Sequence, residues 1–75
     1  MTDEYEKEMT DIIEQMRRSI MNRIDYSKAV TDSDVYELID MEIFMSEHYM
    51  IRYMSPDNRV AIRQMLFDSM NMSVT

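Results

Sequence analysis

The chain has 75 residues, no cysteine, and a net charge of −7 from 15 acidic and 8 basic residues. A domain of this size buries only about 60% of the surface that its unfolded chain exposes, and no disulfide supplements the core. The acidic balance argues against binding to nucleic acid or anionic lipid, because basic faces recognise both. We expect one cytoplasmic domain with no nucleic-acid partner and no direct membrane insertion.

Glycine is absent and Pro56 is the only proline, so the usual residues of hairpins and phosphate-binding loops are missing. This composition predicts an all-α fold, and we expect a small three-helix bundle with helices at about residues 3–24, 32–49 and 56–70. The first helix is indicated by apolar residues at steps of three and four, which form one stripe: Met9, Ile12, Ile13, Met16, Ile20 and Ile24.

The second helix is expected to begin after Thr31, whose hydroxyl can accept a hydrogen bond from the amide of Asp34. Because Asp34 is one methylene shorter than the usual glutamate of a capping box, we predict the cap and make no prediction of the reciprocal bond. Four apolar residues form its inward stripe: Val35, Leu38, Ile39 and Ile43. Larger residues widen that stripe, which predicts contact with more than one neighbour: Met41, Phe44, Met45 and His48.

Ser55 and Pro56 give the clearest helix start, since proline at the first helical position loses an amide that had no partner. No stop residue precedes them, so the second helix is expected to end between Tyr49 and Ser55. Val60 lies near the start of the third helix, and its inward residues follow: Ile62, Leu66, Phe67 and Met70. Residues 71–75 have no pattern and are predicted to be a loose tail.

No group of residues indicates a catalytic, cofactor or metal site. His48 is the only histidine, and the Glu-x-x-His spacing of di-metal bundles is missing because Met45 stands at the glutamate position. Asp11 with Glu14, and Asp40 with Glu42, are better interpreted as solvent-facing charges than as acid pairs for hydrolysis. We therefore expect no catalytic residue, no cofactor and no metal ligand.

Methionine accounts for 11 residues, which permits three interpretations. As core filler it replaces leucine or isoleucine at Met9, Met16 and Met65. As an adaptable surface for a partner helix, it would act through four other positions: Met41, Met45, Met50 and Met54. A Cu(I) site would use thioether ligands, although the absence of cysteine and of a second histidine argues against it: Met50, Met54, Met70 and Met72.

Four short segments also carry a resemblance to a known family: residues 23–27 (RIDYS), 31–40 (TDSDVYELID), 53–55 (YMS) and 62–69 (IRQMLFDS). Together they resemble the helical segment at the start of CpaF/TadA-type secretion ATPases. These are hexameric motors of the type II/type IV secretion superfamily, which power Flp-type pilus assembly and related export.

The resemblance implies an accessory module at the periphery of a motor ring. Its implied partners are the motor's own ATPase core, a neighbouring subunit or inner-membrane platform proteins, at the cytoplasmic face of the cell membrane. ATP hydrolysis in that family needs a glycine-rich phosphate loop, which a chain without glycine cannot match, so no catalytic residue carries over and we expect no enzyme here. The expectation is the N-terminal accessory domain of a larger ATPase. The alternative is a free-standing helical adaptor or antagonist that binds a protein through its methionine-rich surface.

Six large residues beside the core stripe are the candidate protein contacts: Tyr36, Met41, Phe44, Met45, Tyr49 and Tyr53. The competing interpretation places each of them in the ordinary core. We expect charge substitution at Phe44 or Met45 to weaken binding while the domain stays folded, whereas loss of helical circular dichroism would show that these residues belong to the core.

Overall fold

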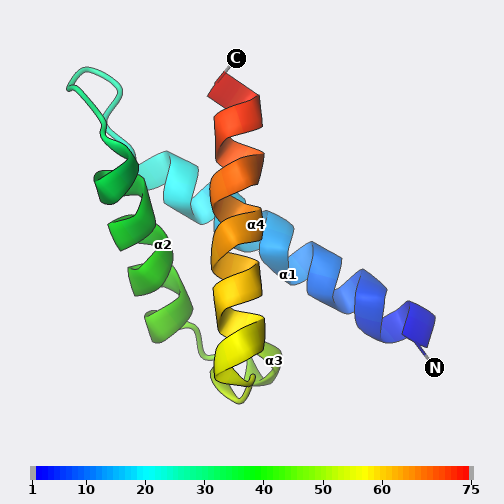
Figure 1. Ribbon diagram of the computed structural model, residues 1–75. Helices are drawn as coiled ribbons and strands as arrows, with labels where there is room; N and C mark the ends of the chain where they lie inside the picture. Colours follow the sequence, from blue (N-terminus) through cyan, green and yellow to red (C-terminus); the bar gives the residue numbers. More distant parts are fainter. Residues whose placement is uncertain (1, 75) are drawn as a thin grey trace.

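The computed structural model describes the backbone of residues 2–74 and the side chains of residues 3–70. Within this range the chain forms four helices and no strand (Figure 1): α1 (Thr2–Arg23), α2 (Asp32–Met45), α3 (Tyr49–Arg52) and α4 (Pro56–Val74). The predicted all-α fold is confirmed, and a short fourth helix, α3, is added to the three that were expected.

The helices are arranged around α4. α2 lies beside α4 and runs in the opposite direction, whereas α1 crosses behind α4 and ends near the start of α2 (Figure 1). The first turns of α1 extend beyond the other helices, and the side chains of residues 3–8 are all exposed. The molecule is accordingly elongated, with extents of 43 × 22 × 19 Å.

One apolar core joins all four helices, and its fully buried members are Ile20, Ile39, Ile51 and Leu66. The predicted stripe of α1 is confirmed, because its central residues are buried: Ile12, Met16 and Ile20. The predicted inward face of α4 is also confirmed: Ile62, Leu66, Phe67 and Met70. One residue of α4 differs from expectation, since Met65, interpreted as core filler, is exposed.

α2 ends at Met45, earlier than the expected end between Tyr49 and Ser55. Polar side chains of the next residues bind backbone amides there, in competition with the helix. The Ser46 hydroxyl accepts from the amide of His48 at 3.4 Å, and Nδ1 of His48 accepts from the amide of Met50 at 3.2 Å. His48 is therefore the N-cap of α3, and its expected place on the inward stripe of α2 is wrong.

The helix starts follow the predicted caps. The Thr31 hydroxyl accepts from the amide of Asp34 at 3.2 Å, and the Ser55 hydroxyl accepts from the amide of Asn58 at 3.2 Å. The reciprocal bond, which was not predicted from the sequence, is also present, with the Thr31 amide donating to Asp34 Oδ2 at 3.1 Å. The extended backbone of Thr31 brings its amide within reach of the shorter carboxylate, and this bond lowers the pKa of Asp34.

The end of α4 lies beyond the predicted boundary at residue 70. The helix continues to Val74, over residues that were expected to form a loose tail. No glycine or proline follows Pro56, so no residue in this stretch stops the helix. Thr75 lies outside the described residues.

Candidate protein-binding surface

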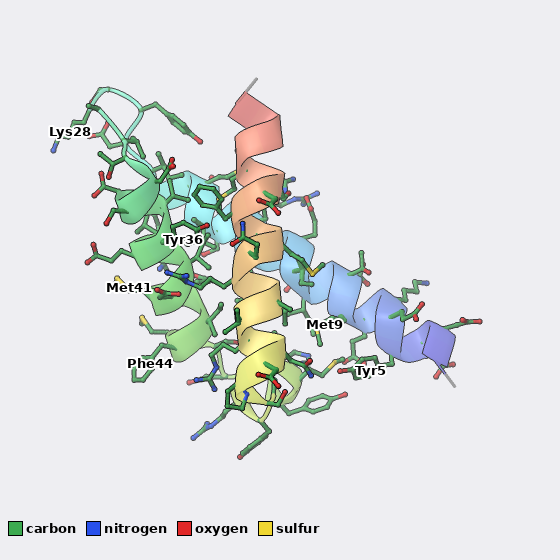
Figure 2. The ribbon with its side chains drawn as sticks, viewed as in Figure 1. Tyr5, Met9, Lys28, Tyr36, Met41 and Phe44 are labelled. Carbon is green, nitrogen blue, oxygen red and sulfur yellow. The ribbon has the colours of Figure 1, made fainter. Side chains whose placement is uncertain are left out.

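Three large apolar residues lie on the outer side of α2, and we call them the α2 surface: Met41, Phe44 and Met45. Their side chains are 46%, 88% and 63% exposed. Figure 2 shows Met41 and Phe44 directed away from α4. The inner side of the same helix is buried through Ile39 and Ile43. The expectation that the α2 surface widens the core stripe is therefore wrong, because α4, α1 and α3 all contact α2 from its inner side.

The α2 surface forms part of an open groove with a volume of about 860 Å³. The residues that α2 contributes recur at helical spacing along the groove, and one residue comes from α4: Ser33, Tyr36, Glu37, Asp40, Met41, Phe44, Met45 and Arg63. The groove therefore follows the length of α2, and its mostly apolar lining includes three charged residues: Glu37, Asp40 and Arg63.

A second hollow of about 470 Å³ lies at the C-terminal end of α2. Residues from the end of α2, the connection after it, α3 and the first turn of α4 line this hollow: Ile43, Phe44, Met45, Ser46, Glu47, Ile51, Arg52 and Arg59. Phe44 and Met45 line both spaces. These two side chains consequently separate the hollow from the groove and are accessible from both.

Tyr36 forms the wall of the groove that faces α4 (Figure 2). Its ring stacks on Phe67 with centroids 4.2 Å apart and planes 2° from parallel, and the guanidinium of Arg63 lies 4.2 Å from the ring centroid. Arg63 Nε donates to Asp40 Oδ1 at 2.8 Å, and the Tyr36 hydroxyl donates to Gln64 Oε1 at 3.2 Å. This wall is therefore fixed by contacts between α2 and α4.

The other two candidate contacts lie apart from the groove. Tyr49 and Tyr53 are exposed at the start and the C-cap of α3, and neither lines the groove or the second hollow. Tyr49 stacks against His48 with centroids 4.9 Å apart, and Arg52 lies 5.9 Å from the ring centroid of Tyr53. The structure thus brings four of the six candidates together and leaves these two outside.

Three of the four acidic residues considered as catalytic pairs have basic partners, and the fourth, Asp11, is exposed. Glu14 accepts from Arg17 Nη2 at 2.6 Å and from Arg18 Nε at 3.1 Å. The Arg17 contact is the main reason that the pKa of Glu14 falls to about 2. Asp40 pairs with Arg63, and Glu42 pairs with Arg23 at 3.2 Å.

The described part of the chain gives little support for a metal site or a membrane-spanning helix. No group of three histidine, aspartate or glutamate side chains there is placed to hold a metal ion. Two methionines of the copper hypothesis, Met50 and Met70, are buried, Met54 is half-buried, and the side chain of Met72 lies outside the described residues. None of the helices over residues 2–74 has the length and apolar character needed to cross a membrane.

Three arginines at the site were not among the predicted contacts: Arg52, Arg59 and Arg63. The sequence carries no local signal for them, since they come from α3 and α4 and reach the site only through the packing of those helices on α2. Comparison with protein-family models, curated proteins and solved structures found no match. The function is therefore inferred from the chemistry of this surface.

Proposed function

We propose that the chain is a non-catalytic protein-interaction domain that binds an amphipathic helix of a partner protein on the α2 surface. The observation that carries this proposal is Phe44, a large apolar side chain that is 88% exposed between two hollows. Exposed apolar residues that are contiguous and rimmed by polar ones are typical of interaction sites. The flanking Met41 and Met45 can adjust their shape to a partner.

The form of the groove favours a helix as the occupant. Its lining residues on α2 extend from Ser33 to Met45, which is about 18 Å at 1.5 Å per residue. A partner helix of about three turns matches that length, with apolar anchors at steps of three and four residues. The anchors would contact the α2 surface, and polar residues would face the rim formed by Glu37 and Asp40.

The cellular setting that we propose is a secretion or pilus-assembly motor. Its support is the resemblance of residues 23–69 to the first helical segment of CpaF/TadA-type ATPases, which includes the whole of α2. In that setting the domain contacts its own ATPase core, a neighbouring subunit or an inner-membrane platform protein, in the cytoplasm at the inner face of the membrane.

A free-standing adaptor or antagonist is the second candidate. The exposure of Met41 and Met45 favours it, because adaptable methionine surfaces suit binding to varied partners. The downstream reading frame distinguishes the two settings. Continuation into a phosphate-loop domain would support the motor, and a stop codon after Thr75 would support the adaptor.

Binding itself is tested by selecting peptides from a displayed library of helices of about 18 residues, which is about five turns. The dissociation constant of each selected peptide for the purified chain is then measured by fluorescence anisotropy. Burial of a phenylalanine is worth about 2 kcal/mol, so Phe44→Glu should raise the dissociation constant by about 30-fold or more. Met45→Glu should also weaken binding. Circular dichroism should show both variants as helical as the parent chain.

Met65→Glu is the matched control, since Met65 is 53% exposed on α4 and lines neither the groove nor the second hollow. This variant should bind the selected peptides as the parent does. Failure to select any peptide, or equal losses in Phe44→Glu and Met65→Glu, would contradict the proposal. Loss of helicity in Phe44→Glu would show that Phe44 belongs to the core.

A further inference from the structure

The basic residues of this acidic chain are mostly paired. Glu14 binds two arginines, Arg23 binds Glu42, and Arg63 binds Asp40. Lys28 lies 3.9 Å from Asp25. Among the described residues, three basic side chains form no ion pair although acids outnumber bases by 15 to 8: Lys7, Arg52 and Arg59.

Two of these three cations share one site. Arg52 and Arg59 both line the second hollow, whereas Lys7 lies on the projecting part of α1. Both arginines are exposed, and their backbones are held by hydrogen bonds from Arg52 N to His48 O at 2.9 Å and from Arg59 N to Ser55 O at 3.0 Å. The packing of α3 and α4 therefore places two arginines that form no ion pair in the lining of the same hollow as Phe44.

The lining of the hollow combines apolar side chains with polar and charged ones. Ile43 and Ile51 are buried beneath it, and Phe44 and Met45 form its border with the groove. Glu47 is the one acidic residue in its lining and forms no ion pair with either arginine. A carboxylate from outside that enters this hollow meets charge-assisted donors, which bind more strongly than neutral ones.

The charge changes sign along the site. The lining of the groove includes Glu37 and Asp40, and Arg63 is the partner of Asp40. The second hollow, at the other end of α2, carries the two unpaired arginines. A helix that lies over Phe44 therefore has one end near acids and the other near bases.

We propose that the partner helix places carboxylates of its first turn against Arg52 and Arg59, and so lies antiparallel to α2. Acids are favoured in the first turn of a helix and bases in the last, so this direction matches both the dipole of the partner and the charges of the site. The inference rests on the proposed function and specifies the chemistry of the partner.

The test uses two synthetic peptides with the apolar residues of a selected binder, both acetylated and amidated at their ends. One carries glutamates in its first turn and lysines in its last turn, and the other carries the reverse arrangement. We expect the glutamate-first peptide to bind about tenfold more tightly, and the difference to shrink as salt is added.

The double variant Arg52→Glu with Arg59→Glu should abolish or reverse this preference. Its matched control is Lys7→Glu with Lys28→Glu, which changes the net charge equally at positions outside the hollow and should leave the preference intact. Equal binding of the two peptides, or tighter binding of the lysine-first peptide, would overturn the inference. If those peptides still depend on Phe44, the proposed function stands, whereas independence from Phe44 refutes both.

Discussion

Leu66 and Met65 are neighbours on α4 with opposite environments, being 0% and 53% exposed. Replacing Leu66 with alanine removes three buried carbon atoms, which at about 0.8 kcal/mol each lowers the free energy of unfolding by about 2.4 kcal/mol. The remaining cavity brings the expected loss to about 3 kcal/mol. Met65→Ala should change the free energy of unfolding by about 0.5 kcal/mol at most, because the side chain is already in water.

Urea denaturation followed by circular dichroism measures both variants. With a slope of about 1 kcal/mol per molar urea, Leu66→Ala should lower the midpoint by about 3 M. A domain of this size is stable by about 4–11 kcal/mol, so this variant lies near the limit of folding. If it is unfolded without urea, Ile39→Val replaces it, with an expected loss of about 1 kcal/mol. Equal losses in Leu66→Ala and Met65→Ala would refute the orientation of α4.

Three further predictions concern the polar contacts. The pKa of Glu14 falls from 4.5 to about 2. The contribution of the ionised Glu14 to stability is therefore present above pH 4.5 and is lost as the pH falls toward 2. Glu14→Gln should flatten the dependence of the melting temperature on pH in this range. Thr31→Ala should lower the free energy of unfolding by about 1 kcal/mol, measured by urea denaturation, whereas Thr31→Ser should preserve it. His48→Ala should weaken α3, whereas His48→Asn should retain the helix. Hydrogen exchange of the Met50 amide measures the difference, as faster exchange in the alanine variant. Equal protection of this amide in both variants would contradict the role of His48 as a cap.

The elements that depend on local pattern were predictable from the sequence. The buried faces of α1 and α4 follow from apolar spacing, and the starts of α2 and α4 follow from Thr31 and Ser55. The end of α2 was not predictable in this way, because no glycine or proline marks it. It depends on hydrogen bonds that Ser46 and His48 form only once the chain has left the helix.

The candidate surface was predictable in part. The spacing on α2 placed Phe44 and Met45 beside the core stripe, but the same spacing allowed them to be buried or exposed. The choice depends on which side of α2 its neighbours cover, and that is a property of the packed helices. For the same reason, the stacking of Tyr36 on Phe67 and the presence of Arg59 and Phe44 in the lining of one hollow had no signal in the sequence.

The break after Met45 links the fold to the proposed binding surface. Because the chain leaves α2 there, α3 places Met50 and Ile51 in the core instead of extending the outer side of α2. Ser46, which ends α2, also lines the second hollow, and α3 supplies Arg52 to it. Continuation of α2 as one helix through residue 49 would remove this arrangement. We therefore expect His48→Ala to weaken peptide binding as well as α3, and His48→Asn, whose side-chain oxygen can accept from the Met50 amide in place of Nδ1, to preserve both.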